Sequence, residues 1–333
     1  MLRSPKNALF AIAGVLSLAM ASPTLAKDIT LKVGTPFSGE QQGGKLLEAF
    51  AEEVNAADVG LDVKVFLASV LGSGEELMED TIRGNVDMTW AYVYANRDPV
   101  FEINSLPYLV STDEEMRETF GNMDSAFSQI MGDTMAKYGL KLLANSAEGF
   151  VGVITTKRPN DPTGVGDKGV NIRVWNSAIG KLATETLGYR TTTMNFSEVF
   201  AAIQSGTVDG AICCTAVGTY DVFTTSQVGK FFTPLHAFAE SSSIYMNSDK
   251  WDELTPEQQS VVQTATTKAA NGLMEWALEN EASYVEKIRE AGWEVLELTD
   301  EEHAAQATRI QEVVWPQLAD RIGQENLDRL QGN

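Results

Sequence analysis

The spacing of hydrophobic positions predicts an α/β unit at the start of the chain. Apolar residues alternate with polar ones in three short segments, as in strands with one buried face, and two intervening segments repeat them at the helical period. The expected strands are 27–34, 61–67 and 86–93. The expected helices are 43–57 and 75–83. This strand–helix order predicts right-handed crossovers and a largely parallel sheet covered by helices.

A second unit of the same kind begins near residue 150. Its expected strands are 149–156, 170–175 and 208–214. Its expected helices are 177–187 and 197–204. A long helical pattern then covers 256–291, followed by a short strand at 293–298 and apolar final helices. The length of the 256–291 helix indicates that it packs across both units.

Both units contain the same short junction, in which a helix passes through Gly-x-Val-Asp into a strand. The two copies begin at Gly84 and Gly206, 122 positions apart, and end at Asp87 and Asp209. Glycine suits the left-handed residue that ends a helix. The junction is therefore either common turn chemistry or a sign of two similar α/β lobes, with a ligand cleft between them at the carboxyl ends of the strands.

The first 26 residues have the composition of a secretory signal peptide rather than of folded structure. Arg3 and Lys6 precede an apolar run over 8–21, and Ala26 ends a segment with the small residues of a cleavage site. The run is too short to span ~30 Å of hydrocarbon as a helix. We therefore expect cleavage after Ala26 and a soluble, extracytoplasmic mature protein, with an uncleaved anchor as the alternative.

The composition is that of a globular protein, with 44% hydrophobic and 21% charged residues. The 333 residues include 46 acidic and 25 basic side chains, which give a formal net charge of −21. Such acidity argues against a nucleic-acid partner, because phosphate binding needs clustered Lys and Arg. With two His and two Cys, most His/Cys metal sites and disulfide scaffolds are excluded. We expect no cofactor and no metal.

A glycine-rich segment at 39–46 has the spacing of a phosphate-binding loop. Two residues argue against that function. Leu46 follows Lys45 where the motif needs Ser or Thr, and the charge of Glu40 opposes a triphosphate. The segment can still contribute to ligand binding, because a helix N-terminus there can donate N–H groups to a small polar ligand.

Nucleophilic catalysis finds no support in the motifs. There is no G-x-S-x-G, and neither H-E-x-x-H nor a spaced Cys pair offers a zinc site. His236 and His303 lie far apart in the sequence, and His303 is expected at the solvated surface of an acidic helix. Glycoside hydrolysis uses paired carboxylates, and chance alone produces such pairs among 46 acidic residues, so this activity stays open. An enzyme is nevertheless the less favoured class of protein.

Cys213 and Cys214 are adjacent at the end of an expected strand. They form either a strained ring disulfide that lines the cleft, which an oxidising compartment permits, or two small buried thiols. The sequence favours the buried thiols.

Arg173 is the strongest candidate for a ligand-binding residue. In the strand 170–175, Ile172 and Val174 point to one face, and Arg173 and Trp175 point to the other. An arginine beside a tryptophan in an apolar strand combines a two-pronged anion donor with an apolar wall. On the pattern alone, a surface arginine on an edge strand is an equally good interpretation.

Several segments favour the ligand-binding interpretation because they resemble the DctP family, the solute-binding receptors of tripartite ATP-independent periplasmic (TRAP) transporters. The similar segments include 168–174 and 194–210, and the block from Arg173 to Gly210, with N-F-S-E-V-F-A-A-I-Q-S-G-T-V-D-G at 195–210, is quite specific. Shorter similar segments are 71–72, 84–88, 106–109 and 251–257. Together they cover nearly the whole chain after the signal peptide, in order.

The resemblance implies a two-lobed α/β fold, like that of type II periplasmic binding proteins, which closes on a small organic anion in an interlobe cleft. In the family, an arginine at the position of Arg173 typically pairs with the ligand carboxylate, and the aromatic residue at Phe196 packs on the ligand. The other ligand-binding residues that we expect are Trp175, Tyr92, Ala91, Cys213, Ser73 and Glu40.

Two departures from the family pattern concern the ligand. Ile212 and Cys213 stand where many members have Glu-Asn, and Val151 stands where many have a second arginine. Fewer polar groups imply a smaller or more apolar monoanion than a dicarboxylate or sialic acid, and a guanidinium also suits a sulfonate. Trp90 is a further candidate for an aromatic wall, unless it faces the core.

The resemblance also implies partners and a place in the cell. We expect a monomeric periplasmic receptor, not an enzyme, that delivers its ligand to the small and large membrane subunits of a TRAP permease. The expected organisation is a signal peptide at 1–26, lobe I mainly at 27–148, lobe II mainly at 149–240, and crossing segments with C-terminal helices at 241–333. The alternatives are a receptor for an ATP-driven importer and, less favoured, an exported enzyme on the same scaffold.

Overall fold

One nine-stranded sheet organises the computed structural model, which describes Met1 and residues 29–332. The signal peptide expected at 1–26 therefore lies, apart from Met1, outside the described residues. The strand order is β2-β1-β3-β8-β4-β7-β5-β6, and β9 pairs with β8. The strands are β1 (Ile29–Gly34), β2 (Leu61–Phe66), β3 (Met88–Ala91), β4 (Leu140–Thr155), β5 (Asn171–Val174), β6 (Arg190–Thr193), β7 (Gly210–Cys214), β8 (Phe231–Asn247) and β9 (Glu294–Val295).

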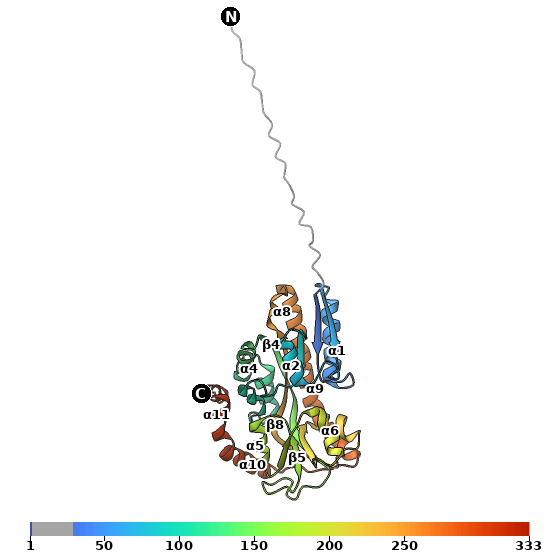
Figure 1. Ribbon diagram of the computed structural model, residues 1–333, viewed down its shortest axis with the longest axis vertical. Coiled ribbons are helices and arrows are strands. Elements are labelled where there is room, and N and C mark those ends of the chain that lie inside the picture. The colour runs from blue at the N-terminus through green and yellow to red at the C-terminus, as the bar shows by residue number, and fades with distance from the viewer. Residues whose placement is uncertain (2–28, 333) are drawn as a thin grey trace.

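Two units with the same strand–helix order form the two ends of this sheet (Figure 1). The first is β1-α1-β2-α2-β3, with α1 (Gln42–Ala56) and α2 (Gly74–Ile82). The second is β5-α5-β6-α6-β7, with α5 (Ala178–Thr186) and α6 (Phe196–Gln204). In each unit the first strand lies between the other two and pairs with both in parallel. The parallel sheet predicted for the first unit is confirmed, and the second unit repeats it.

The Gly-x-Val-Asp junction has the same geometry in both units. Gly84 and Gly206 have φ angles of +74° and +75°, in the left-handed region that glycine enters without strain. The carboxylates of Asp87 and Asp209 each accept a hydrogen bond from a backbone N–H of the first strand of their own unit, at 2.7 and 3.0 Å. This shared arrangement favours two similar lobes over chance turn chemistry.

The centre of the sheet is antiparallel, which corrects the expectation of a largely parallel sheet. The long strands β4 and β8, of 16 and 17 residues, pair with each other, and they also pair with β7 and β3 in the same antiparallel sense. The expected strand 149–156 covers only the second half of β4, and β8 has no counterpart among the expected strands. Buried polar residues inside both strands, such as Asn145 and Ser242, obscure their hydrophobic pattern.

The long helix α9 (Pro256–Glu290) contacts both units, as its length predicts. It begins in a capping box, in which Thr255 Oγ1 accepts from the N–H of Gln258 and the Gln258 side chain accepts from the N–H of Thr255. The helix packs against α1 of the first unit, against β4, and against the short helix α7 (Ala216–Gly218) that follows β7. The fold is therefore two-lobed, with β4, β8 and α9 crossing between the lobes.

The remaining described helices lie outside the two units, and several of them pack against the crossing strands. They are η1 (Pro99–Ser105), α3 (Asp113–Met116), η2 (Arg117–Gly121), α4 (Ala126–Ala136), η3 (Thr219–Thr224), α8 (Ser248–Asp252), α10 (Asp300–Val313), η4 (Trp315–Gln317), α11 (Ala319–Ile322) and α12 (Gln324–Leu330). None of the described helices is both long enough and apolar enough to span a membrane.

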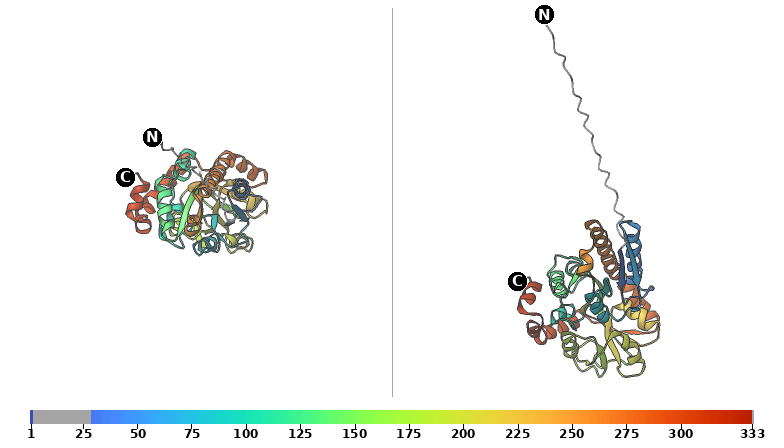
Figure 2. Two further views of the ribbon diagram at one scale, coloured as in Figure 1. Left: turned by 90° about the horizontal axis from the view of Figure 1, so that it is seen from above. Right: turned by 45° about the horizontal axis from the view of Figure 1, so that its top comes forward.

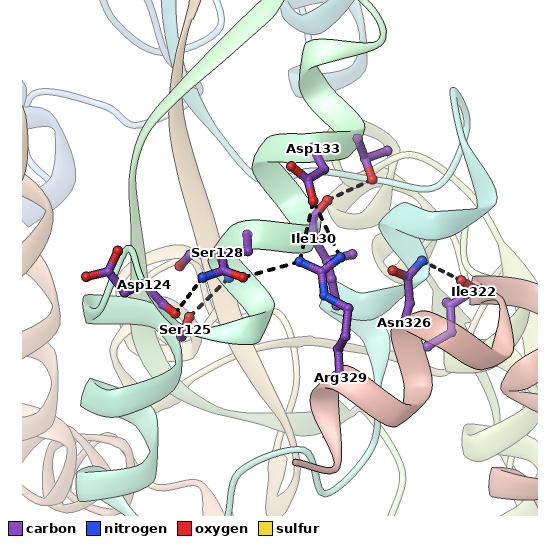
Figure 3. A network of polar contacts seen from close by, with 10 residues as sticks. Asp124, Ser125, Ser128, Ile130, Asp133, Ile322, Asn326 and Arg329 are labelled. Atoms are coloured by element: carbon purple, nitrogen blue, oxygen red, sulfur yellow. Dashed lines mark hydrogen bonds and ion pairs between the residues drawn. The ribbon is translucent and has the colours of Figure 1, made fainter. Parts of the chain in front are cut away.

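The C-terminal helices lie along one side of the molecule (Figure 2). Arg329 of α12 connects them to α4, since its guanidinium lies 3.4 Å from Asp133 Oδ2 and 3.4 Å from Gln129 Oε1 (Figure 3). The strand expected at 293–298 is shorter than the pattern indicates, because only the two residues of β9 pair with β8.

Candidate ligand-binding site

A cavity of about 890 Å³ lies between the two lobes. The carboxyl ends of four parallel strands reach it, through segment 36–43 after β1, segment 92–94 after β3, Arg173 on β5 and Cys214 on β7. Side chains of α6, α9, β4 and β8 complete the wall. Ligands of open α/β sheets bind at this edge of the strands, and the volume suits a small organic molecule.

Seven of the eight residues expected from the sequence line this cavity. They are Arg173, Phe196, Trp175, Tyr92, Cys213, Ser73 and Glu40. Ala91 is the exception, because it is fully buried in β3, where it pairs with Ser243 of β8. Ile172 and Val174, on the opposite face of β5 from Arg173, are buried in the core, as strand alternation predicts. That the seven residues contact a ligand stays a prediction.

Arg173 presents a buried positive charge to the cavity. Its side chain is 3% exposed. Its Nε donates to the carbonyl of Met194 at 3.0 Å, and its guanidinium carbon lies 5.8 Å from the centre of the Phe196 ring. Burial lowers the pKa of Arg173, but an arginine remains charged at neutral pH. Nε uses one of the five N–H donors, and the neighbouring Tyr94 side chain interacts with the guanidinium as well.

Aromatic side chains form much of the remaining wall. Trp175, Phe196 and Tyr92 all line the cavity. Trp175 Nε1 donates to Ser105 Oγ at 2.9 Å, which holds the indole in place, whereas Phe196 is 41% exposed and its ring is accessible. Trp90 faces the core rather than the cavity, since it is fully buried.

Two carboxylates that the sequence analysis did not identify, Glu148 and Glu240, also line the cavity. The Tyr92 hydroxyl donates to Glu148 Oε1 at 3.0 Å, and the N–H of Thr215 donates to Glu240 Oε2 at 3.0 Å. Burial raises the pKa of Glu148 to about 7. Burial, with the charge of Glu148 nearby, raises the pKa of Glu240 well above its ordinary value. The sequence feature that could have identified these two residues is that each is the single carboxylate in its long strand, Glu148 in β4 and Glu240 in β8.

Further lining residues come from segments that carry no motif. They are Tyr94, Asn104, Asp221, Trp276 and Tyr284. Two of these, Trp276 and Tyr284, lie on α9, so the helix that connects the lobes also contributes directly to the cavity. Helical periodicity alone does not show which face of a long helix meets a cavity.

The glycine-rich spacing at 39–46 has a structural cause. A Cβ atom on Gly44 would collide with the carbonyl oxygen of Ser38, so α1 can begin in this position only with glycine there. Ser73, which also lines the cavity, is the N-cap of α2 and forms a capping box with Glu76. Two helix N-termini of the first unit, held by local packing and capping, therefore contribute to the wall of the cavity.

Cys213 and Cys214 form a disulfide, which corrects the expectation of two free thiols. Both residues line the cavity at the end of β7. The next residue, Thr215, donates its N–H to Glu240 across the wall. Sequence adjacency left both states open, and the backbone path at the end of β7 brings the two sulfurs together.

His236 and His303 are neighbours in space, with ring centres 5.3 Å apart, although they lie far apart in the sequence. His303 is half-buried, which corrects the expectation of a solvated residue. Burial lowers the pKa of both histidines. Neither lines the cavity. Within the described part of the chain, no group of three or more His, Cys, Asp or Glu could hold a metal ion.

The chain is similar to known proteins over most of its length. A family model named DctP, described as bacterial extracellular solute-binding protein, family 7, matches residues 35–320. The C4-dicarboxylate-binding periplasmic protein DctP of Rhodobacter capsulatus is 29% identical and aligns over 95% of this chain and 94% of its own. The 2,3-diketo-L-gulonate-binding periplasmic protein YiaO of Escherichia coli (strain K12) is 26% identical and aligns over 89% of this chain and 88% of its own.

A solved structure with a similar fold is a TRAP periplasmic solute-binding protein from Desulfovibrio salexigens, crystallised with bound orotic acid. The TM-score is 0.81 at 20% sequence identity, and the alignment covers 91% of this chain and 97% of that chain. At this level of identity the similarity establishes the fold, and it agrees with the two-lobed architecture described above.

Proposed function

Because the chain belongs to the DctP family of bacterial extracellular solute-binding proteins, we propose that it is a periplasmic receptor that captures a small organic acid and delivers it to the membrane subunits of a TRAP permease. The names of two relatives, one for a C4-dicarboxylate and one for 2,3-diketo-L-gulonate, support an organic acid as the ligand. The similar structure with bound orotic acid supports the same class. A receptor of this kind binds its ligand without converting it.

The buried guanidinium of Arg173 is the observation that carries the proposal. No ion pair within 4.0 Å among the described residues involves it. A buried charge without a partner in its own chain is costly. A ligand carboxylate that accepts two parallel N–H bonds from the guanidinium offsets this cost. Arg173 therefore holds the acidic group of the ligand, while Phe196 and Trp175 pack against the rest.

Closure of the lobes then buries the complex. Lobe I, mainly 27–148, contributes Tyr92 to the wall, and lobe II, mainly 149–240, contributes Arg173. The segments that cross between them, β4, β8 and α9, are the elements about which the lobes rotate. In a closed cleft the ion pair is stronger than in water, because the surroundings are less polarisable.

Identification of the bound solute tests this proposal. The protein is expressed with its signal sequence, purified from the periplasm without refolding, and analysed by native mass spectrometry. A thermal-shift screen of carboxylates and sulfonates follows. We expect an organic acid that is recovered intact and raises the melting temperature. Recovery of a chemically altered product would indicate an enzyme instead, and stabilisation only by compounds without an acidic group would overturn the proposal.

The assignment to a TRAP transporter has its own test. Membrane vesicles that contain the cognate membrane subunits are supplied with the loaded receptor, and uptake of labelled solute is measured. Uptake driven by an ion gradient is the expected result. Uptake that depends on ATP would show instead that the receptor serves an ATP-driven importer.

A further inference from the structure

Glu148 and Glu240 oppose each other on the strand pair that crosses between the lobes. The register of β4 and β8 pairs Ala147 with Ser241 and then Phe150 with Ala239, so a β-bulge at Glu148 and Gly149 lies opposite Glu240. Gly149 has a φ of +104°, which glycine adopts without strain. A bulge of this kind redirects side chains next to a binding site. Both carboxylates line the cavity as a result.

The protein gives these two carboxylates no positively charged partner in direct contact, and the charge of Arg173 acts on Glu240 only from beyond ion-pair distance. Each accepts one hydrogen bond, Glu148 from the Tyr92 hydroxyl and Glu240 from the N–H of Thr215. Neither forms an ion pair within 4.0 Å among the described residues. Removing two such groups from bulk water is costly unless something else supplies donors.

Glu102 shows how the same fold treats an acid with a purely structural role. It is 3% exposed and accepts hydrogen bonds from Ser177 Oγ and from the N–H groups of Ala178 and Ile179, at the start of α5. Its carboxylate is satisfied by the chain. Glu148 and Glu240 each have one donor from the chain and open into the cavity, so their remaining acceptor positions are available to a ligand.

We propose that the solute is a zwitterion, whose carboxylate binds Arg173 and whose positively charged nitrogen binds between Glu148 and Glu240. This inference rests on the proposed function and specifies its ligand. The three charged groups line the same cavity, and the guanidinium comes from β5 while the carboxylates come from β4 and β8. The cavity therefore offers a donor for a carboxylate and acceptors for a positively charged nitrogen, one for each end of a zwitterion.

The chemistry of the wall favours such a ligand over a simple anion. Ionised carboxylates are acceptors only, so an ammonium or amidinium group provides the N–H donors that they lack. The aromatic rings of Tyr92 and Trp276 line the same cavity and attract a cation through their faces. An anion without a positive group would instead meet two carboxyl groups that must stay protonated.

Proton exchange on binding distinguishes the two kinds of ligand. The charged or titratable groups that act on the Glu148–Glu240 pair are Tyr92, Tyr94, Arg173 and Glu281. The tyrosines remain neutral and the arginine remains charged near neutral pH, so exchange comes from the carboxyl groups. A bound cation lowers their pKa values and releases protons at pH 7, whereas a bound anion raises them and takes protons up.

The test uses pairs of compounds that share a carbon skeleton, of which only one member has a positively charged nitrogen. Proline is compared with pyroglutamate, and phenylalanine with 3-phenylpropionate, within a panel that also holds the other amino acids and cyclic amidinium carboxylates. Binding to the full-length mature protein is measured by isothermal titration calorimetry at pH 7, in buffers of different ionisation enthalpy. We expect the zwitterionic members to bind more tightly and to release up to about one proton.

Variants assign this effect to the two acids. Glu148→Gln and Glu240→Gln should each weaken binding of the zwitterion roughly 10- to 100-fold, because each removes a charge-assisted hydrogen bond, and should reduce proton release. Glu48→Gln, at an exposed position of α1, is the matched control and should leave both quantities unchanged. Proton release by the wild type needs no variant, so it remains a test if a variant fails to fold.

Two results would overturn the inference. Tighter binding of the anionic members with proton uptake, and loss of that binding in Arg173→Ala, would reject the zwitterion and leave the proposed function intact. Failure of every carboxylate in both sets to bind would reject the proposed function and this inference together.

Discussion

Replacing Arg173 by alanine removes the guanidinium that β5 and the Met194 carbonyl hold at the cavity wall. Because a buried charge pair with the ligand is lost, we expect binding to weaken by about 2–5 kcal/mol, roughly 30- to several-thousand-fold. Titration calorimetry with the identified ligand measures the change. Arg190→Ala, at an exposed position on the neighbouring strand β6, should bind like the wild type. An unchanged affinity in Arg173→Ala would remove this residue from the site.

Glu148 makes the stability of the empty protein depend on pH. Its pKa is about 7 in the folded chain against an ordinary 4.5, so the folded state holds the proton more tightly. The stabilising contribution is full below pH 4.5 and is lost as the pH rises through 7. The free energy of unfolding of the wild type should therefore fall between pH 5 and pH 8. Urea unfolding at the two pH values should show that this fall is smaller by about 1–3 kcal/mol in Glu148→Gln.

The control for that measurement is Glu48→Gln, whose exposed carboxylate lies in the middle of α1. It should show the pH dependence of the wild type. If Glu148→Gln and the wild type lose the same free energy of unfolding between the two pH values, the carboxyl group of Glu148 ionises as it does in an unfolded chain.

The strand pattern at the residue level predicted most of what the structure shows around Arg173. Alternation placed Arg173 and Trp175 on one face of β5 and buried Ile172 and Val174 on the other, and the structure agrees. Glu148 was not predicted, because its position depends on a bulge in β4 and on the strand that lies opposite. A side chain whose direction follows from its own strand is predictable, and one whose direction follows from a partner strand is not.

At the level of elements, the start of α1 depends on a close approach that only glycine permits. A Cβ at Gly44 would collide with the carbonyl oxygen of Ser38. Alanine usually stabilises a helix relative to glycine by about 1 kcal/mol. We expect Gly44→Ala instead to lower the free energy of unfolding by about 1–3 kcal/mol, because backbone atoms must move. Urea denaturation measures the difference.

The matched substitution is Gly272→Ala in α9. A Cβ there would meet only Leu46 Cδ2 at 3.4 Å and Cδ1 at 3.7 Å, which is ordinary contact. This variant should be neutral or more stable by up to about 1 kcal/mol. Equal effects of the two substitutions would show that the contact with Ser38 does not constrain α1.

Elements with one buried face were predicted well, and so were the short buried strands β3 and β7, whereas the long strand β8 was not predicted. The helix expected at 43–57 corresponds to α1 (Gln42–Ala56), and the helix expected at 256–291 corresponds to α9 (Pro256–Glu290). The strand β8 was missed because both of its faces are largely covered, so no alternation marks it. Hydrophobic periodicity arises when one face of an element is buried and the other is exposed. It is weak in an element whose two faces are both buried.

For the whole molecule, we expect binding to be accompanied by closure of the two lobes. Small-angle X-ray scattering of the ligand-saturated protein should give a smaller radius of gyration than that of the free protein, because a hinged cleft becomes narrower. Arg173→Ala at the same ligand concentration should scatter like the free protein. Superimposable curves for free and saturated wild type would contradict closure.

The sequence by itself determined the two α/β units, their Gly-x-Val-Asp junctions and the direction of Arg173, because each of these depends on residues that are neighbours along the chain. Only the tertiary structure decided that β4 pairs with β8, and hence that Glu148 faces Glu240 beside the same cavity. It also decided the disulfide state of Cys213. These features arise from contacts between distant segments, and such contacts form only when burial brings the segments together.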